Sequence, residues 1–310
     1  MGVSVLFSSH TPVKDFHEPD PGVADEVDKA IDGLRQWVAG KAPDLVVIVG
    51  PDHFNGFFYR LMPSFCIGVA AESVGDWNTP AGPLPVASDL AARCVSDLHT
   101  AGIDVALSHQ MEVDHGITQT LSQIFSWQDL PSLLPVFINC AAPPRPPLVR
   151  VVALGRALGE FVAQCDANVL LVASGGLSHD PPIPVLADAP EPVRKRLIEG
   201  GRLPPEARAK REQRVIADAA RQVSGESLQR PLNPDWDEAF LERLSSFDFQ
   251  AITAMKDDAI SHDGGCGGHE IRTWIAVAAA AEAAGIRQLK RHYYRAIPQW
   301  VAGYGMMIGE

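Results

Sequence analysis

The sequence predicts an α/β protein, a single three-layer α/β/α domain over residues 1–310 with a mostly parallel or mixed central sheet and helices on both faces. Short apolar runs rich in β-branched residues recur along the chain, which is typical of strands buried on both faces. Segments with apolar residues at helical spacing separate several of these runs. Because 46% of the residues are hydrophobic and 21% are charged, the composition excludes a disordered or fibrous chain.

The predicted strands are five apolar runs: residues 3–7, 44–49, 103–107, 134–138 and 168–173. Between the first two, Asp20 and Pro21 have the residue types of a helix N-cap and of a first helical position. Apolar residues then follow at helical spacing from Val23 to Val38, which predicts a β-α-β unit. The helical pattern recurs at residues 148–163, before the last of the five strands.

The later part of the chain is predicted to be helical. Its helical segments are residues 206–223, 236–244 and 270–284. Because the strands come first and the helices later, we expect these helices to form a lid or an interface layer around the sheet.

Charge and cysteine content exclude several classes of protein. The 26 Lys and Arg against 38 Asp and Glu give a net charge of −12 without any basic run, which argues against nucleic acid as a partner. No segment approaches the roughly 20 apolar residues of a membrane span, and residues 1–8 lack the features of a secretory signal. Five widely spaced cysteines without a C-x-x-C pair disfavour a disulfide framework and a zinc ribbon. We therefore expect a cytoplasmic protein that acts on a small molecule.

Four of the ten histidines lie at or just after predicted strand ends: His10, His53, His115 and His179. In open α/β sheets, ligands bind beyond the carboxyl ends of the strands, where such loops converge. Each histidine taken alone is explained as well by a helix cap or a bond to a backbone carbonyl. Four of them in this position favour a functional site.

A metal site is the chemistry that these residues fit best. Two imidazoles and one carboxylate on one face form the ligand set of non-haem Fe(II) oxygenases. His10 and His53 end the first two strands of the β-α-β unit, so their side chains are expected to be neighbours. Glu270, which follows the glycine-rich loop 264–268 at the start of a helix, is the candidate third ligand.

Other catalytic motifs are incomplete. Thr273 stands where the second histidine of H-E-x-x-H would be, which excludes that zinc site. Asp180 replaces the last glycine of a G-x-S-x-G elbow around Ser178, so a serine nucleophile is disfavoured. No G-K-[ST] follows the glycines at 175–176, so nucleotide binding is weakly supported.

Several long stretches resemble the class III extradiol ring-cleaving dioxygenases, the superfamily of the protocatechuate 4,5-dioxygenase catalytic subunit. Within that superfamily, the resemblance is to members whose catechol substrate carries a propionate side chain. The resemblance covers nearly the whole chain and is carried by SHTP at 9–12, PDHFNGFFY at 51–59, MPSFCIGV at 62–69, VDHG at 113–116, LPVFIN at 134–139, SGGLSHDPP at 174–182, PLNPDWD at 231–237 and HEIRTWIA at 269–276.

The resemblance implies a ligand set and an acid–base pair. The Fe(II) ligands fall on His10, His53 and Glu270, the proton donor on His115 and the proton acceptor on His179. It also implies a catechol and O₂ as reactants and a homo-oligomer, a tetramer or larger. His179 is expected to take a proton from the bound catechol, and His115 to protonate the leaving oxygen when the ring is rearranged.

The role of one further carboxylate stays open at this point. Asp114, next to His115, is expected either to orient that imidazole or to cap a helix. Phe57, Phe58, Tyr59 and Trp77 are candidate pocket aromatics or ordinary packing residues.

The alternatives to this reading concern the substrate and the metal. They are extradiol cleavage of a different substituted catechol, a non-catalytic member of the superfamily, and a zinc-dependent hydrolase that uses the same two histidines. The residues that bind the substrate side chain are not predicted.

Overall fold

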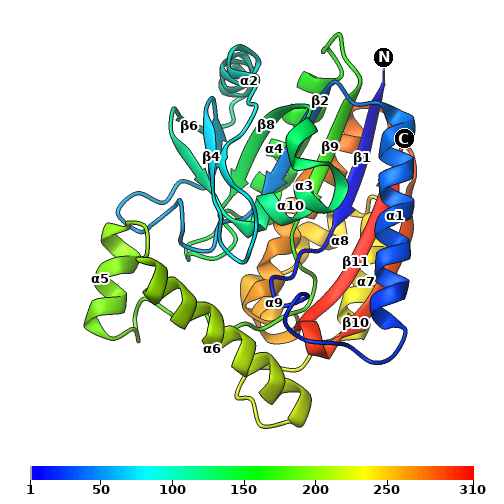
Figure 1. Ribbon diagram of the computed structural model, residues 1–310. Helices are drawn as coiled ribbons and strands as arrows, with labels where there is room; N and C mark the ends of the chain where they lie inside the picture. The colour runs from blue at the N-terminus through cyan, green and yellow to red at the C-terminus, as the bar shows by residue number, and fades with distance from the viewer. Residues whose placement is uncertain (1) are drawn as a thin grey trace.

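Parallel strands form the middle of an eight-stranded sheet in the computed structural model, which describes residues 2–310. The strand order is β10-β11-β1-β9-β2-β8-β3-β6. In the middle of the sheet, β1 (Val3–Ser8), β9 (Val169–Ser174), β2 (Leu45–Gly50) and β8 (Ser132–Ile138) run parallel to one another. These four correspond to predicted strands, and the predicted α/β class with a mixed sheet is confirmed (Figure 1).

Both edges of the sheet contain antiparallel pairings. At one edge, β3 (Phe65–Gly68) pairs antiparallel with β8, and β6 (Ala106–Ser108) pairs parallel with β3. The strand predicted at 103–107 is therefore observed as the shorter strand β6, which begins at Ala106. At the other edge, β10 (Leu289–Ile297) and β11 (Ala302–Gly309) form a hairpin whose second strand pairs antiparallel with β1.

The hairpin corrects the expectation that strands come first and helices later. The side chains of β10 are mostly exposed or half-buried, so the strand has no continuous apolar run. In β11, the glycines at 303, 305 and 309 have low strand propensity. Both strands are held by tertiary pairing rather than by their own sequence preference.

Alternate residues of the strands face two separate cores. Leu6, Val46 and Ile48 pack with α1 (Val23–Lys41) and α3 (His115–Ile124) on one face. Val47 and Val49 pack on the other face, where the helices are α2 (Ser88–Thr100), α4 (Leu148–Val162) and α10 (Ile271–Ala283). This arrangement gives three layers, as predicted.

The helix α10 belongs to the core rather than to a lid. A Cβ at Gly155 or Gly159 of α4 would lie 2.2 Å from the carbonyl oxygen of Ala276 or 2.3 Å from that of Ala280, so only glycine permits this approach. The expectation that 270–284 forms part of an outer layer is therefore wrong. The apolar, alanine-rich sequence of α10 fits its full burial.

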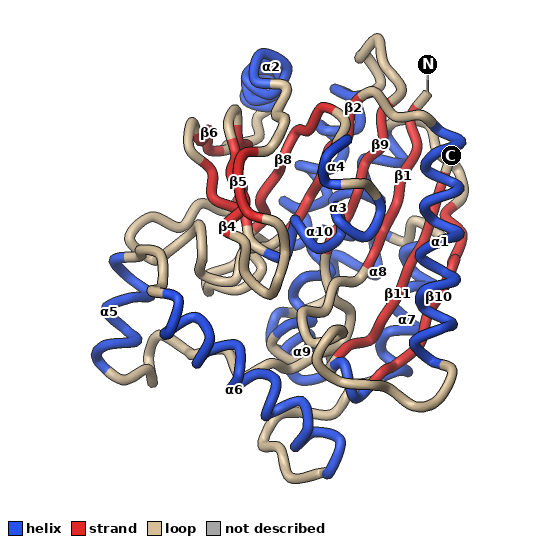
Figure 2. Tube along the Cα trace, viewed as in Figure 1, coloured by secondary structure: helices blue, strands red, loops and turns tan. Residues whose placement is uncertain are grey.

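The remaining elements lie around this sandwich. They are β4 (Ala71–Val74), β5 (Ala81–Pro83) and β7 (Met111–Val113), which form a small second sheet, and the helices α5 (Glu191–Glu199), α6 (Pro205–Ser224), α7 (Pro234–Ser245), α8 (Phe249–Ala254) and α9 (Asp257–Asp263). Figure 1 shows α5 and α6 at the lower left, beyond the end of the sheet where β1 finishes. Long loops gather between that end and α6 (Figure 2).

Two further sequence expectations can be compared with the helices. The helix α1 begins at Val23 after Gly22, whose φ is +85°, so the predicted cap at Asp20 and Pro21 is wrong. Among the described residues, no helix has both the length and the apolar character needed to cross a membrane.

Candidate active site

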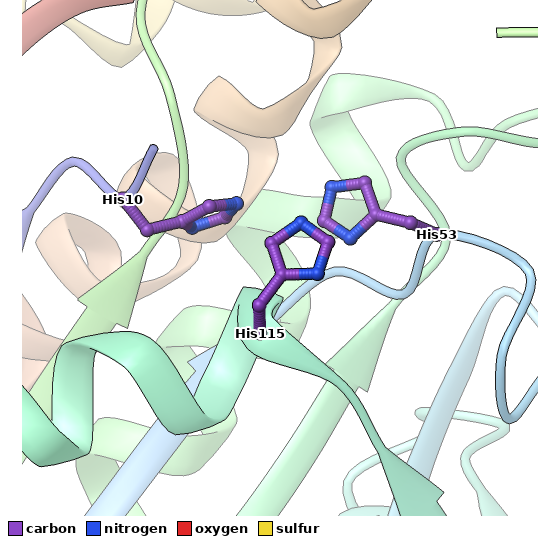
Figure 3. A group of neighbouring side chains, drawn as sticks. All are labelled: His10, His53 and His115. Atoms are coloured by element: carbon purple, nitrogen blue, oxygen red, sulfur yellow. The ribbon is translucent and has the colours of Figure 1, made fainter. Parts of the chain in front are cut away.

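The predicted histidines lie together beyond the carboxyl ends of the central strands. His10 follows β1, His53 follows β2, and His115 begins α3. The strand β9 lies between β1 and β2, yet the ring centroids of His10 and His53 are 5.5 Å apart. The predicted proximity of these two side chains is confirmed, and Figure 3 shows the rings of His10, His53 and His115 close together.

The carboxylate of Glu270 is in the middle of the imidazoles. Its oxygens lie 3.6 Å from Nε2 of His10, 3.1 Å from Nε2 of His53 and 3.4 Å from Nε2 of His179. The Glu270 side chain is buried, and the backbone N–H of Gly176 donates to its carboxylate at 2.6 Å, which fixes the position of the carboxylate. The structure thus places the predicted trio and His179 in one cluster.

The spacing of these atoms fits a bound metal ion. Ligands at roughly 2.1 Å from a metal and at right angles to each other are about 3.0 Å apart. The separations of 3.1 Å and 3.6 Å between the Glu270 oxygens and the two Nε2 atoms are close to that value. Two imidazoles and one carboxylate therefore present a facial set of donors without a large rearrangement.

His115 is also near this set, but its ring orientation distinguishes it from a third imidazole ligand. One ring nitrogen of each of His10, His53 and His115 lies within 4.8 Å of the others. The rings of His53 and His115 are stacked, with centroids 4.2 Å apart and planes at 20°. Because a bound metal lies in the plane of its imidazole, two stacked rings do not share one ion. The rings of His10 and His53, at 88°, can do so.

Each imidazole is held through its other nitrogen. Nδ1 of His10 lies 3.2 Å from Oγ of Ser174, and Nδ1 of His53 lies 3.2 Å from the carboxylate of Asp114. Nδ1 of His115 lies 2.6 Å from the carboxylate of Asp76. Such contacts fix the tautomer and the ring orientation of histidines in metal sites.

These contacts correct one of the two roles expected for Asp114. Its carboxylate accepts hydrogen bonds from His53, not from His115, so the expectation that it orients the His115 ring is wrong. The alternative expectation is confirmed, because Asp114 caps α3 by accepting from Gly116 N at 2.9 Å. Asp76, which reaches His115 from the end of β4, was missed because it is 39 residues away in sequence and has no motif of its own.

Burial and charge act in opposite directions in the cluster. Burial outweighs the attraction of Glu270 and lowers the pKa of His10 to about 3, so this imidazole is neutral. Burial also opposes charge on Glu270, but the nearby His179 outweighs it and holds the Glu270 pKa well below its usual range. For His53, burial is outweighed by Asp114, and the pKa is raised well above its usual value. The cluster therefore has a neutral donor and an ionised carboxylate, which favours a cation between them.

Two glycines hold the ring of His179. A Cβ at Gly267 would lie 2.1 Å from Nε2 of His179, and one at Gly176 would lie 2.3 Å from its Cε1. Nδ1 of His179 lies 3.0 Å from the carbonyl oxygen of Leu177, which limits the movement of the ring. The glycine-rich loop before Glu270 thus has a steric reason to be glycine at 267.

Replacement of Gly267 by alanine is expected to displace the His179 ring and to lower kcat about 10²-fold or more, because the added methyl overlaps the imidazole. The measurement is the steady-state rate together with the melting temperature. Gly40→Ala is the matched control: a Cβ there meets open space in α1, so the rate is expected to be unchanged. An unchanged rate in Gly267→Ala would contradict the steric argument.

A cavity opens onto the cluster and connects it with solvent. It is lined by His10, His53, His115 and His179 together with residues of α6. Of the four candidate pocket aromatics, Trp77 lines this cavity, whereas Phe57 stacks on Phe137 at 3.8 Å. Phe58 and Tyr59 belong to a separate apolar cluster, so ordinary packing is the correct interpretation for three of the four.

Comparisons with known proteins show the family of this chain. Residues 4–305 match the family described as the catalytic LigB subunit of aromatic ring-opening dioxygenase. The chain is 47% identical over 310 residues, 100% of this chain and 99% of the other, to the 2,3-dihydroxyphenylpropionate/2,3-dihydroxicinnamic acid 1,2-dioxygenase of Cupriavidus pinatubonensis. It is 46% identical over 306 residues to the protein of the same name from Rhodococcus sp, covering 99% of this chain and 98% of the other.

A solved structure has a similar fold. The crystal structure of the uncharacterized protein JW3007 from Escherichia coli K12 aligns with a TM-score of 0.52 and 15% sequence identity. The alignment covers 99% of this chain and 98% of that chain. At this identity, the similarity concerns the fold alone.

Proposed function

Because the chain belongs to the LigB family of aromatic ring-opening dioxygenases, we propose that it is an Fe(II)-dependent extradiol dioxygenase for 2,3-dihydroxyphenylpropionate and 2,3-dihydroxycinnamate. The proposed product of the first substrate is 2-hydroxy-6-oxonona-2,4-diene-1,9-dioate. The observation that carries the proposal is the Glu270 carboxylate within 3.6 Å of His10 Nε2 and 3.1 Å of His53 Nε2. Its other support is the identity to relatives of that name.

His10, His53 and Glu270 are the proposed iron ligands. Their nitrogen and oxygen donors, without a thiolate, are those of non-haem Fe(II) sites. When bound there, Fe(II) supplies Lewis acidity toward the two catechol hydroxyls and a path for electrons from the substrate to O₂.

His179 is the proposed proton acceptor. Its Nδ1 has the Leu177 carbonyl oxygen as partner, and a carbonyl only accepts, so the Nδ1 hydrogen points there. Nε2 faces the Glu270 carboxylate at 3.4 Å, and it would present its lone pair to the substrate once a cation bound by Glu270 neutralised that carboxylate. A catechol hydroxyl held beside Glu270 can pass its proton to this nitrogen.

His115 is the proposed proton donor. Its Nδ1 donates to Asp76 at 2.6 Å, and the backbone N–H of His115 donates to the same carboxylate at 2.8 Å. The Asp76 carboxylate fixes the ring so that Nε2 is the nitrogen that would pass a proton to an oxygen leaving the ring carbon. The two histidines therefore differ in the hydrogen-bond partner of Nδ1, which is the Leu177 carbonyl for His179 and the Asp76 carboxylate for His115.

The whole of residues 1–310 is proposed to form one catalytic domain. We also propose a homo-oligomer, a tetramer or larger, in keeping with the exposed apolar side chains of Val223 in α6 and of Leu228 in the loop that follows it. The proposed cytoplasmic location is supported by the five cysteines, all of which are free thiols.

Metal removal and reconstitution test the proposed chemistry. Chelator-treated protein is expected to be inactive and to regain O₂ uptake and a yellow ring-opened product with Fe(II) and ascorbate, because an oxygen-activating site needs the reduced metal. Hydrogen peroxide is expected to inactivate the loaded protein reversibly. The measurement is an oxygen-electrode assay over a small panel of catechols. Full activity with Zn²⁺ alone, or without O₂ uptake, would contradict the proposal.

A further inference from the structure

One cation lines the cavity beside the candidate metal site. Among the cavity-lining residues in the described chain, Arg211 is the one Lys or Arg. It comes from α6, where residues 211, 215, 218 and 222 all line the cavity at helical spacing. The helix therefore presents a fixed row of side chains to the bound molecule, with the guanidinium in that row.

The guanidinium keeps hydrogen-bonding capacity for a ligand. Nη2 of Arg211 donates to the carbonyl oxygen of His53 at 2.7 Å, and Nη1 donates to Oδ1 of Asn55 at 3.4 Å. A guanidinium has five N–H donors, and these two contacts use only part of them. Within residues 2–310, Arg211 has no carboxylate partner within 4.0 Å.

The acidic residue on the same cavity wall does not neutralise Arg211. Asp218 accepts from Arg221 at 2.9 Å, from Gln222 at 3.4 Å and from Ser227 at 3.1 Å. Its negative charge is thus compensated by a different arginine. Because the whole chain has a net charge of −12, an anionic ligand needs a local positive group such as Arg211.

Arg211 is connected to the histidine cluster through His53. Its Nη2 contacts the backbone of His53, and the ring of the same residue contacts Glu270 at 3.1 Å. Arg211 and Glu270 thus contact the backbone and the ring of one residue, His53. Three carbon–carbon bonds of a propionate reach about 4 Å from the ring, so the side chain can extend from the cluster toward the guanidinium.

We propose that Arg211 binds the carboxylate of the substrate side chain and selects catechols with an anionic three-carbon chain over neutral ones. This inference rests on the proposed function. A guanidinium pairs with a carboxylate through two parallel hydrogen bonds, which adds directional preference to charge attraction. Arg211 acts in binding and specificity, whereas the acid–base steps belong to His115 and His179.

The activity test compares two substrates of equal length. One is 2,3-dihydroxyphenylpropionate, and the other is 3-propylcatechol, which lacks the charge. In Arg211→Gln, the ratio of their kcat/KM values is expected to fall about 10- to 100-fold, mainly through KM for the acid. Arg211→Lys is expected to restore part of the ratio. Arg214→Gln removes one charge from an exposed site on the same helix and is expected to leave the ratio unchanged.

A binding measurement separates the inference from the proposed function. Trp77 and Trp300 line the cavity, so the tryptophan fluorescence of the protein is expected to change when 3-phenylpropionate or neutral 3-phenylpropionamide binds to metal-free protein. Wild type is expected to prefer the acid, and Arg211→Gln is expected to lose that preference. Iron content is measured in every variant, since Arg211 also contacts His53.

Each outcome then has one meaning. An unchanged substrate ratio and an unchanged acid preference in Arg211→Gln would overturn the inference. An equal loss for both substrates together with lost iron, and no change in the acid preference, would assign Arg211 a structural role and overturn it too. If wild type cleaves neither catechol, the proposed function fails, and the fluorescence titration still decides whether Arg211 binds a carboxylate.

Discussion

Glu270→Ala is expected to remove the metal and the activity together. The carboxylate contacts three imidazoles within 3.6 Å and is fixed by the Gly176 N–H, so its loss removes the acidic member of the cluster. Without it, two imidazoles remain, one of them neutral because burial lowers the pKa of His10 to about 3. We expect the rate to fall further than the 10²- to 10⁴-fold that one acid–base group supplies. His10→Ala is expected to behave in the same way.

Iron content after reconstitution and the oxygen-uptake rate are the two measurements. The matched control is Glu282→Ala, which removes a carboxylate at the end of the same helix, where Glu282 pairs with Arg156 on the surface. An exposed pair of this kind contributes about 0–1 kcal/mol to stability, so iron and rate should stay near wild type. Iron retained in Glu270→Ala at the wild-type level would show that this carboxylate is not a ligand.

Alanine at His115 and at His179 is expected to slow different steps by about 10²- to 10⁴-fold each. His179→Ala removes the acceptor beside Glu270, so the stages that need a deprotonated catechol should slow. His115→Ala removes the donor paired with Asp76, so catechol and iron should bind nearly normally while later rearrangement stalls or the product changes. Stopped-flow absorbance on anaerobic substrate addition, followed by oxygen, separates the two stages.

His262→Ala is the control for loss of an imidazole, because that side chain is 80% exposed and its hydrogen-bond partner is the neighbouring Asp263. Its rate is expected to match wild type. Near-wild-type rates and bell-shaped pH profiles in both His115→Ala and His179→Ala would refute the acid–base assignment. The metal assignment would survive that result, because it depends on different residues.

The sequence was informative where local pattern and tertiary position agree. Continuous apolar runs predict β1, β2, β8 and β9, because a strand that is covered on both faces has no solvent-facing side for polar residues. Histidines just after such strands converge whatever the order of the strands in the sheet. For this reason His10 and His53 were placed together correctly, although β9 lies between their strands.

Features that depend on distant partners could not be predicted. Asp76 reaches His115 through the small second sheet, and Ser174 reaches His10 across two neighbouring strands. Neither residue type has a motif at its position. Arg211 was similarly hidden, since it lies in a helix whose alternating charges are typical of a solvated surface. Only the packing of α6 against the cavity distinguishes it from its exposed neighbours.

The place of β11 at the inner side of the hairpin has a consequence for biosynthesis. The residue before His10 is fixed by the last strand: Ser9 N donates to Gly305 O at 2.8 Å, and Gly305 N donates to Ser9 Oγ at 2.9 Å. The first strand leaves the ribosome long before its edge partner β11, which lies almost 300 residues further along the chain. A nascent chain can therefore collapse around the parallel strands while the loop carrying His10 still lacks its anchor.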